Sequence, residues 1–526
     1  MSDLFPAPNG VLLAELSRLL PRDALLRGGE QAEVMTSSEQ LPDVVGETIR
    51  NGYTLAGIAV EWEDPGWLCR YVFYCATRSG FVHVLLRGEA GDQLPSISPI
   101  IFAADWPERE IEDLFEIPFE GHPLLGDFVL HNEDWPEGVA PMHPAYGASE
   151  PKPPRSERVW RPQRFVDAPG AFSMSVGPVY AGVAESAQFR LESEGEQILH
   201  AMPRLFYKYR GLEKIAEGQD AQEVLLLAER VNGTSAVGHA LAFAQAAEAI
   251  AHVDVPPRAL ALRLVFAELE RMRAHLSTIE DLVESTGLQV PTAMLAALVE
   301  DLLRQSGRAA GHRYLFGLVR LGGVAMDIGD TAAADIVKTT RLVIARLSRI
   351  GDQLAYDNGF LDRVEEVGSL HVQSALRHGV VGPVGRASGL GRDLRAVQPY
   401  GWYAGRDIRV ALAKEGDAYA RLRVLTAEAA ESQRLLEATL DALPSGDVCA
   451  PWRPQAGAAL GWSEAPLGGT FHWLRLSPTG TVVRWHVMPP SFTNWPALAT
   501  AVEGSAFQDF PIILASFGLS AAESDR

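Results

Sequence analysis

A proline-rich segment divides the chain into two parts whose sequence patterns differ. Prolines recur between Pro136 and Pro169, and the central run PAYGASEPKPPRSERVWRPQ has a composition that favours extended chain over packed elements. We therefore predict a linker over residues 136–170, between a first domain over residues 1–135 and a second over residues 171–526.

The first domain has the pattern of a small α+β unit. Three runs rich in aromatic and β-branched residues, 54–62, 67–75 and 81–86, predict a β-hairpin or meander. The run ADWPEREIEDLFEI that follows predicts a helix, in which Asp105 and Glu108 have the spacing of a capping box. After residue 186 the pattern is one of long helices, clearest in the apolar stripe that runs from Val265 to Val283. We expect an α+β protein whose second domain is mainly helical with minor β structure.

Charge and hydropathy exclude some classes of function. The formal net charge of −21 argues against a nucleic-acid partner, because phosphate binding needs a basic surface. There is no run of about 18 uninterrupted apolar residues to span a bilayer. The first residues, MSDLFPAPNG, lack the features of a secretory signal, so a cytosolic location is expected.

Several runs resemble a known family, in the order in which the family has them. ADWPEREIEDLF (104–115) and EGHPLLGDFVLHNEDWPEG (120–138) resemble the small hydrophilic subunit of complex I. Landmarks of the large quinone-site subunit are resembled by YRGLEKIAEG (209–218), ERVNGTSAVGHALAFAQAAE (229–248), RALALRLVFAELERMRAHL (258–276), VVGPVGRASGLGRDLRAVQPY (380–400) and PPSFTNWPAL (489–498). With both parts on one chain and GWSEAPLGG near Trp462, the chain is similar to the large subunits of formate hydrogenlyase and hydrogenase-4, in the complex I-like and energy-converting NiFe hydrogenase family.

This resemblance implies a fold, a location and a set of partners. The second domain is expected to fold like a NiFe hydrogenase large subunit, and the chain to lie peripherally on the cytoplasmic face of the inner membrane. The partners implied are an Fe–S subunit of the small complex I type, a ferredoxin-like Fe–S subunit and membrane subunits that include antiporter-like proteins.

The positions that hold nickel and iron in the hydrogenases carry other residues here. The resemblance places Asn232, Ser235, Ser520 and Glu523 where the hydrogenases have cysteines. Amide, hydroxyl and carboxylate oxygens are poor substitutes for the soft thiolates of a NiFe centre. The three cysteines of the chain, Cys69, Cys75 and Cys449, lie elsewhere and form no C-x-x-C pair. We therefore expect this chain to bind no metal or cofactor, with the Fe–S cluster in a partner subunit.

The residues that match the quinone partners of complex I have changed as well. By position, the family's histidine and tyrosine become Tyr180, or a residue close to it, and Gly233. A tyrosine hydroxyl still bonds a carbonyl, but its free pKa of about 10 differs from that of a histidine. Quinone stays a candidate ligand. Where hydrogenase-type relatives look like EAPRGE, this chain has Leu467 and Gly469, and so lacks both an arginine and a glutamate.

A set of polar residues remains around the former cavity. The candidate catalytic residues are Tyr180, Glu185, Glu213, His239, Arg386 and Asp393, with Arg210 and Arg395 beside them. Buried charges are costly unless paired, which predicts a connected network that relays protons or holds a conformational switch. The alternative for each charged residue is a structural salt bridge, and for His239 a helix-packing role.

Two functions are compatible with these features. In the first, an electron from a partner Fe–S subunit reaches a quinone-like acceptor beside this chain, and the transfer is coupled to ion translocation. In the second, the chain is a non-catalytic coupling or scaffold subunit of the same kind of complex. An active hydrogenase is a remote third alternative, because the thiolates are absent.

Overall fold

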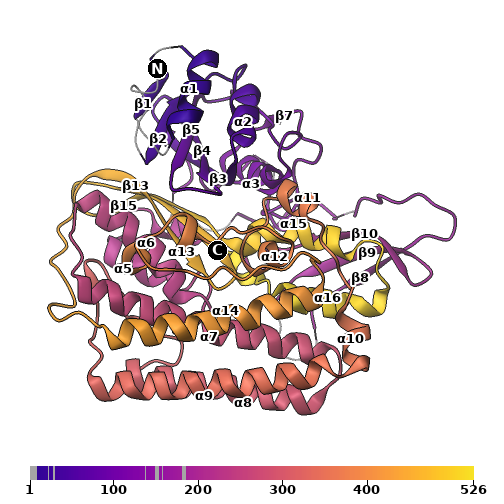
Figure 1. The fold of residues 1–526 in the computed structure, drawn as a ribbon. Helices are drawn as coiled ribbons and strands as arrows, with labels where there is room; N and C mark the ends of the chain where they lie inside the picture. The colour runs from indigo at the N-terminus through magenta and orange to yellow at the C-terminus, as the bar shows by residue number, and fades with distance from the viewer. Residues whose placement is uncertain are drawn as a thin grey trace.

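The computed structural model describes residues 9–21, 23–27, 30–136, 138–147, 153–156, 158–160, 162–180 and 185–526. Helices account for 43% and strands for 19% of the chain, and the strands form several small sheets, which confirms the predicted α+β class. In Figure 1 the N-terminal part sits above a layer of long helices, and the C-terminal segments lie between the two.

The first part is built on a five-stranded sheet. Its strands are β1 (Leu25–Arg27), β2 (Gln31–Met35), β3 (Tyr53–Glu63), β4 (Gly66–Cys75) and β5 (Phe81–Glu89), in the order β1-β2-β5-β4-β3. The β3-β4-β5 meander is antiparallel, as the sequence predicted, and β2 pairs with β5 in parallel. Helices α1 (Gly10–Leu19), α2 (Leu41–Arg50) and α3 (Asp105–Phe115) complete this part.

The predicted capping box at the start of α3 is wrong. Asp105 is already the first helical residue, Ala104 is the N-cap, and no side chain caps the helix. A 3-10 turn over Phe102–Ala104 leads directly into α3, so the chain enters the helix one residue early. The Glu108 carboxylate instead accepts hydrogen bonds from the Ile97 N–H (2.7 Å) and the Ser96 hydroxyl (2.5 Å).

Short pairings and a second sheet follow. β6 (Leu94–Pro95) pairs with β7 (Phe119–Glu120), and β8 (Phe172–Val176), β9 (Gln188–Glu194) and β10 (Gln197–Arg204) form an antiparallel sheet. This sheet lies at the right of Figure 1. Among the described residues of 136–170 there is no helix or strand.

Long helices form the lower layer of the molecule (Figure 1). They are α7 (Pro257–Ser285), α8 (Gln289–Ala310), α9 (Asp330–Ala355) and α14 (Ala418–Asp441). The other helices between β10 and β13 in the sequence are α6 (Ala236–Ala251) and the short helices α4 (Leu212–Ala216), α5 (Ala221–Ala228), α10 (Asn358–Val364), α11 (Val372–Arg377), α12 (Gly382–Ala387) and α13 (Leu394–Val397). The pair β11 (Val319–Arg320) and β12 (Gly323–Val324) lies between α8 and α9 in the sequence. Helix α7 contains the predicted stripe, and it packs against α14, α8, α6 and the C-terminal helix α16 (Phe510–Phe517). It is therefore the central helix of this layer.

The C-terminal segments join the two parts. The sheet β13 (Gly457–Ala465), β14 (Gly468–Leu476) and β15 (Val482–Met488) packs on α6, and it is followed by α15 (Pro490–Val502), α16 (Phe510–Phe517) and α17 (Ala521–Ser524). Aromatic rings connect this sheet to the first one, with Tyr74 and Phe471 at 5.5 Å between ring centroids and Phe81 and Trp462 at 4.7 Å. One apolar core accordingly extends from α1 to α17.

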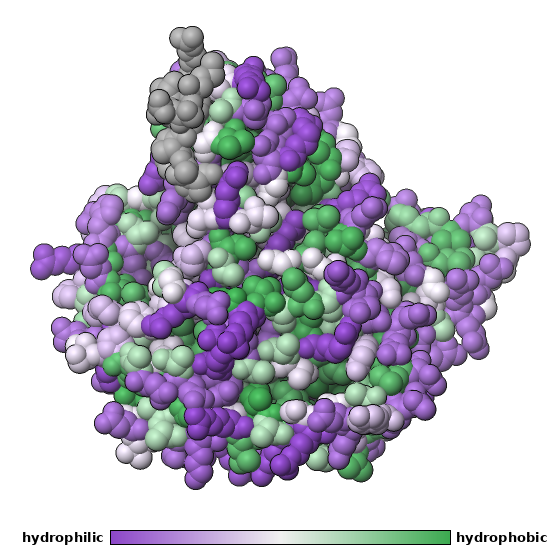
Figure 2. Space-filling view, viewed as in Figure 1, coloured by the Kyte–Doolittle hydropathy of each residue, from purple (hydrophilic) through white to green (hydrophobic). Residues whose placement is uncertain are grey.

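Hydrophilic and hydrophobic residues are interspersed on the face shown in Figure 2. Within the described ranges, every helix is too short or too polar to cross a bilayer.

Candidate functional site

The four positions matched to metal-binding cysteines come together in the structure. Asn232 and Ser235 lie in the turn before α6, and Ser520 and Glu523 lie at the start of α17. The Asn232 amide donates to Glu523 Oε1 at 3.3 Å, although 291 positions separate the two residues. Ser520 accepts a hydrogen bond from the Glu523 N–H and donates to Glu185 at 2.9 Å. The four residues that the resemblance matches to metal ligands therefore lie close together, and we call the place that they share the former metal position.

Hydrogen bonds from Arg210 stabilise the same region. Its guanidinium donates to the carbonyls of Arg230, Val231 and Ala522, so it links the turn before α6 to α17. Gly233, the other position matched to a quinone partner, lies beside the Phe316 ring.

His239 joins this group through a chain of hydrogen bonds with a defined direction. The Trp485 indole donates to His472 Nδ1 at 3.2 Å, and His472 Nε2 is 3.1 Å from His239 Nδ1. Because an indole N–H only donates, His472 must carry its proton on Nε2 and give that hydrogen bond to His239. His239 then carries its own proton on Nε2, which lies 3.1 Å from Glu523 Oε1. This series of hydrogen bonds ends at the Glu523 carboxylate.

Burial and hydrogen bonds determine the charges of His472 and Glu523 in this series. Burial lowers the pKa of His472 well below its usual value, so His472 is neutral. Burial opposes ionisation of Glu523, but hydrogen bonds from His239 and Ser491 outweigh it and lower the pKa of this carboxyl. An ionised carboxylate that is already bonded to an amide and to an imidazole does not fit a NiFe centre, which needs thiolates. Throughout the described ranges, no group of three or more histidine, cysteine, aspartate or glutamate side chains is placed to hold a metal ion.

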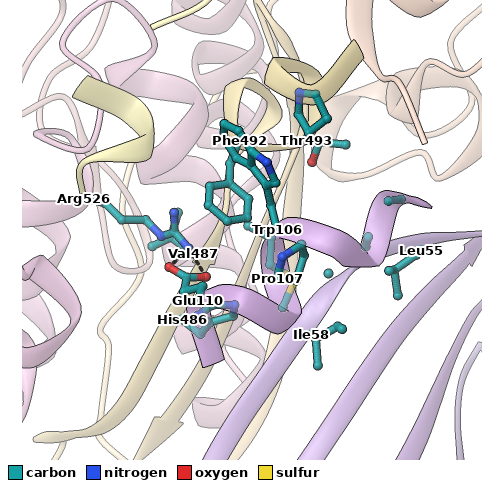
Figure 3. A pocket seen from close by; sticks show the side chains of 15 residues that line it. Leu55, Ile58, Trp106, Pro107, Glu110, His486, Val487, Phe492, Thr493 and Arg526 are labelled. Atoms are coloured by element: carbon teal, nitrogen blue, oxygen red, sulfur yellow. Dashed lines mark hydrogen bonds and ion pairs between the residues drawn. The ribbon is translucent and has the colours of Figure 1, made fainter. Parts of the chain in front are cut away.

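Glu213 belongs to a second buried cluster, on the other side of the C-terminal sheet. Its carboxylate accepts from Arg484 (2.8 Å) and Arg526 (3.1 Å) and lies 3.1 Å from His486 Nδ1. Burial opposes its ionisation, but His486 and Arg484 hold the pKa of Glu213 well below its usual range. Figure 3 shows Arg526 facing Glu110 of α3, to which it donates at 2.7 Å, beside a cavity of about 20 Å³. That volume suits about one water molecule, not an acceptor.

Arg386 and Asp393 belong to a third cluster, packed on one face of α7. Arg386 donates to Glu428 (2.5 Å) and Glu464 (2.8 Å), and Arg395 donates to Asp393 (2.7 Å). The remaining members are Glu268, Arg271, His275, Tyr403 and Ser432, and the ion-paired side chains of the cluster are at most 1% exposed. Every carboxylate here has a cation and further hydrogen bonds, so we call these residues the saturated cluster.

The predicted single network is thus three groups. Within the described ranges, no side-chain hydrogen bond joins the saturated cluster to the groups around Glu523 or Glu213. No local signal in the sequence marks four members of these groups, which were therefore not predicted: His472, Trp485, Glu268 and Glu428. His472, for example, lies 233 positions from His239.

A cavity of about 430 Å³ adjoins the former metal position. Tyr180 and Glu185 line it, with residues from α7, α16 and α17 and the turn between β13 and β14. The Tyr180 hydroxyl donates to the Ala187 carbonyl at 2.5 Å, and burial raises the pKa of Tyr180 to about 12. Tyr180 is therefore a poor proton donor here. Leu467, at the position of the missing arginine, also lines this cavity.

Comparisons with known proteins agree with the resemblance stated above. Residues 286–455 and 448–526 match the model of the respiratory-chain NADH dehydrogenase 49 kDa subunit, and residues 35–152 match that of the 30 kDa subunit. Hydrogenase-4 component G of Escherichia coli is 29% identical over 439 residues, which cover 82% of this chain and 76% of the relative.

Two further relatives are similar over most of their length. Formate hydrogenlyase subunit 5 of Escherichia coli is 29% identical over 446 residues, with 82% of this chain and 77% of the relative covered. The NADH-quinone oxidoreductase C/D protein of Gluconacetobacter diazotrophicus is 28% identical over 517 residues, with 87% and 84% covered.

Proposed function

Because this chain belongs to the family of the complex I 49 kDa and 30 kDa subunits and of the hydrogenase-4 and formate hydrogenlyase large subunits, we propose that it serves a membrane-associated oxidoreductase complex as a peripheral-arm subunit. In this proposal an electron leaves an Fe–S cluster of a partner subunit and reduces a quinone-like acceptor in the 430 Å³ cavity. The reduction is coupled to ion translocation by membrane partners.

The observation that carries this proposal is the contrast between the former metal position and the cavity beside it. At the former position the Asn232 and His239 side chains are both hydrogen-bonded to the Glu523 carboxylate, so these groups are already engaged with one another. The adjoining cavity is of a size that suits a small organic molecule. The acceptor would therefore bind in the cavity, while the buried group supplies a fixed wall.

A second candidate is a coupling or scaffold subunit that performs no chemistry. The Tyr180 hydroxyl favours it, because this hydroxyl is already bonded within its own loop. In this alternative the buried ionic clusters would hold the two parts of the chain together and transmit movements of its partners.

The test is made on the intact complex, purified from its native membrane. We would assay nickel, hydrogen evolution with a low-potential dye, and inhibitor-sensitive reduction of quinone analogues, in wild type and in Ser277→Phe. Ser277 is a half-buried cavity residue of α7, so phenylalanine would fill the cavity without breaking any charge pair. The matched control is Glu280→Gln, on the same helix but not among the residues that line the cavity.

The acceptor-reducing function predicts no nickel and quinone reduction that falls at least tenfold in Ser277→Phe but not in Glu280→Gln. The scaffold function predicts a stable complex that reduces no acceptor in any variant. Stoichiometric nickel with hydrogen turnover would contradict both.

A further inference from the structure

Arg273 is a buried cation on the cavity side of α7. The residue is 4% exposed, and its Nη2 donates to the Thr234 carbonyl in the turn before α6. Its guanidinium carbon lies 5.0 Å from the centroid of the Tyr314 ring, which is a favourable cation–π distance. These two contacts fix the guanidinium beside the cavity, which Arg273 lines.

This guanidinium has no ionic partner in the described part of the chain. No carboxylate oxygen of those residues lies within 4.0 Å of it, so Glu270 attracts it only from farther away, and its Nε and Nη1 groups form no hydrogen bond there. Every other buried arginine of α7 differs: Arg263 is paired with Glu248, and Arg271 with Glu268. Burying a charge without a counter-charge in contact is costly, so an unpaired guanidinium beside a cavity indicates that a ligand supplies the missing charge.

We propose that the cavity binds an organic carboxylate with an apolar body, and that Arg273 is the residue that recognises its carboxylate group. A guanidinium presents two parallel N–H groups that match a carboxylate. This inference rests on the proposed function in that it names the class of ligand that the same cavity takes.

The rest of the lining specifies the body of the ligand. Trp495, Leu514, Leu519 and Phe189 supply apolar surface, which suits a ring or short chain. Glu185 also lines the cavity, but its carboxylate already accepts hydrogen bonds from Ser520 and from the Ala522 N–H.

Position along α7 determines the orientation of the ligand. Arg273, Ser277 and Asp281 form one row, so Asp281 lies about 12 Å from Arg273 along the helix axis. The negative end of the ligand would therefore lie at Arg273, away from Asp281. Among the described residues that line the cavity there is one cation, Arg273, and there are two acidic residues, Glu185 and Asp281. This balance of charge matches a single negative charge on the ligand better than the double charge of a phosphate group.

The experiment measures binding of benzoate to the purified full-length chain by calorimetry. Benzamide, which has the same shape and no charge, is the matched ligand, and phenyl phosphate tests the doubly charged alternative. The variants are Arg273→Gln, Arg273→Lys and a control, Arg230→Gln, which removes an exposed arginine that stacks on Phe316 and does not line the cavity.

We expect saturable benzoate binding, at least about tenfold weaker binding of benzamide, and a similar loss for benzoate in Arg273→Gln. Arg273→Lys should recover part of the affinity, and Arg230→Gln should leave it unchanged. If Arg273→Gln does not fold, Ser277→Leu tests the inference instead. It narrows the cavity while Arg273 stays in place, so it should weaken benzoate binding.

Several results would overturn the inference: no benzoate binding by wild type, equal affinity for benzoate and benzamide, tighter binding of phenyl phosphate, or unchanged affinity in the Arg273 and Ser277 variants. Failure here is distinguishable from failure of the proposed function. Carboxylate binding that depends on Arg273 in a complex that reduces no acceptor would refute only the electron-transfer role. Acceptor reduction with no such binding would refute only this inference.

Discussion

Two faces of the same helix, α7, differ in whether their buried charges are paired within the chain. On one face Glu268, Arg271 and His275 belong to the saturated cluster, where each charge has its counter-charge within the chain. On the other face Arg273 and Ser277 line the cavity, and the guanidinium has no ionic partner among the described residues. Buried charge alone therefore does not mark a functional site. A charge whose partners are complete stabilises the fold, whereas an incomplete one indicates a ligand.

The largest expected effect comes from breaking the saturated face. Arg386→Leu would leave Glu428 and Glu464 buried without their shared cation, and should lower the free energy of unfolding by about 3–5 kcal/mol. Denaturant unfolding followed by circular dichroism measures it. Arg341→Leu, which breaks an exposed pair with Glu437, should cost less than about 1 kcal/mol. Equal losses in the two variants would contradict the distinction between the faces.

A pH measurement tests Glu270, which lies one turn before Arg273 on α7 and accepts hydrogen bonds from the Val237 and Gly238 N–H groups at the start of α6. Burial raises the pKa of Glu270 from 4.5 to about 7. The unfolded chain releases this proton near pH 4.5 and the folded chain only near pH 7, so this carboxyl makes stability fall as pH rises through that window.

Glu270→Gln should therefore flatten the pH dependence of the unfolding free energy between pH 4.5 and 7, by about 1–3 kcal/mol in total. The control is Glu223→Gln on the exposed side of α5, which should keep the wild-type slope. An unchanged slope in Glu270→Gln would refute the assignment.

Removing one neutral donor from the saturated face should have a smaller effect. The Tyr403 hydroxyl donates to Glu268 at 2.5 Å, and Tyr403→Phe leaves that carboxylate its two arginines and Ser432. We expect a loss of about 1–2 kcal/mol by thermal unfolding. Tyr356→Phe, at a tyrosine that is 90% exposed, should show no change. A comparable shift in both variants would mean that the hydroxyl of Tyr403 contributes nothing specific.

The smallest change in stability is expected on the cavity face. Two serine-to-alanine variants, one on each face, measure the difference. Ser277→Ala should change stability by no more than about 0.5 kcal/mol, because this half-buried serine lines open space. Ser432→Ala removes a donor that lies 2.6 Å from Glu268, and should cost about 1–2 kcal/mol. If Ser277→Ala were the more damaging of the two, the cavity face would be structural as well.

Secondary-structure elements with a local sequence pattern could be predicted from the sequence alone. The strands around residues 54–62, 67–75 and 81–86 and the helix through Val265 were predicted because side-chain periodicity follows directly from backbone geometry. Asn232, Ser235, Ser520 and Glu523, the positions that the resemblance matches to the family's cysteines, were also identified from the sequence. These features depend on neighbours or on matching positions, and not on packing.

Which charged side chains form ion pairs depends on the tertiary structure and could not be predicted from the sequence. The predicted network became separate clusters because its members pair with residues far along the chain, such as Glu428 for Arg386 and Arg484 for Glu213. The capping box at Asp105 failed for a related reason, since the Ile97 and Ser96 donors lie close enough to engage Glu108. The isolation of Arg273 follows from the same physics: ion pairing depends on distances of a few ångströms, and those distances exist only after the helices and sheets have packed.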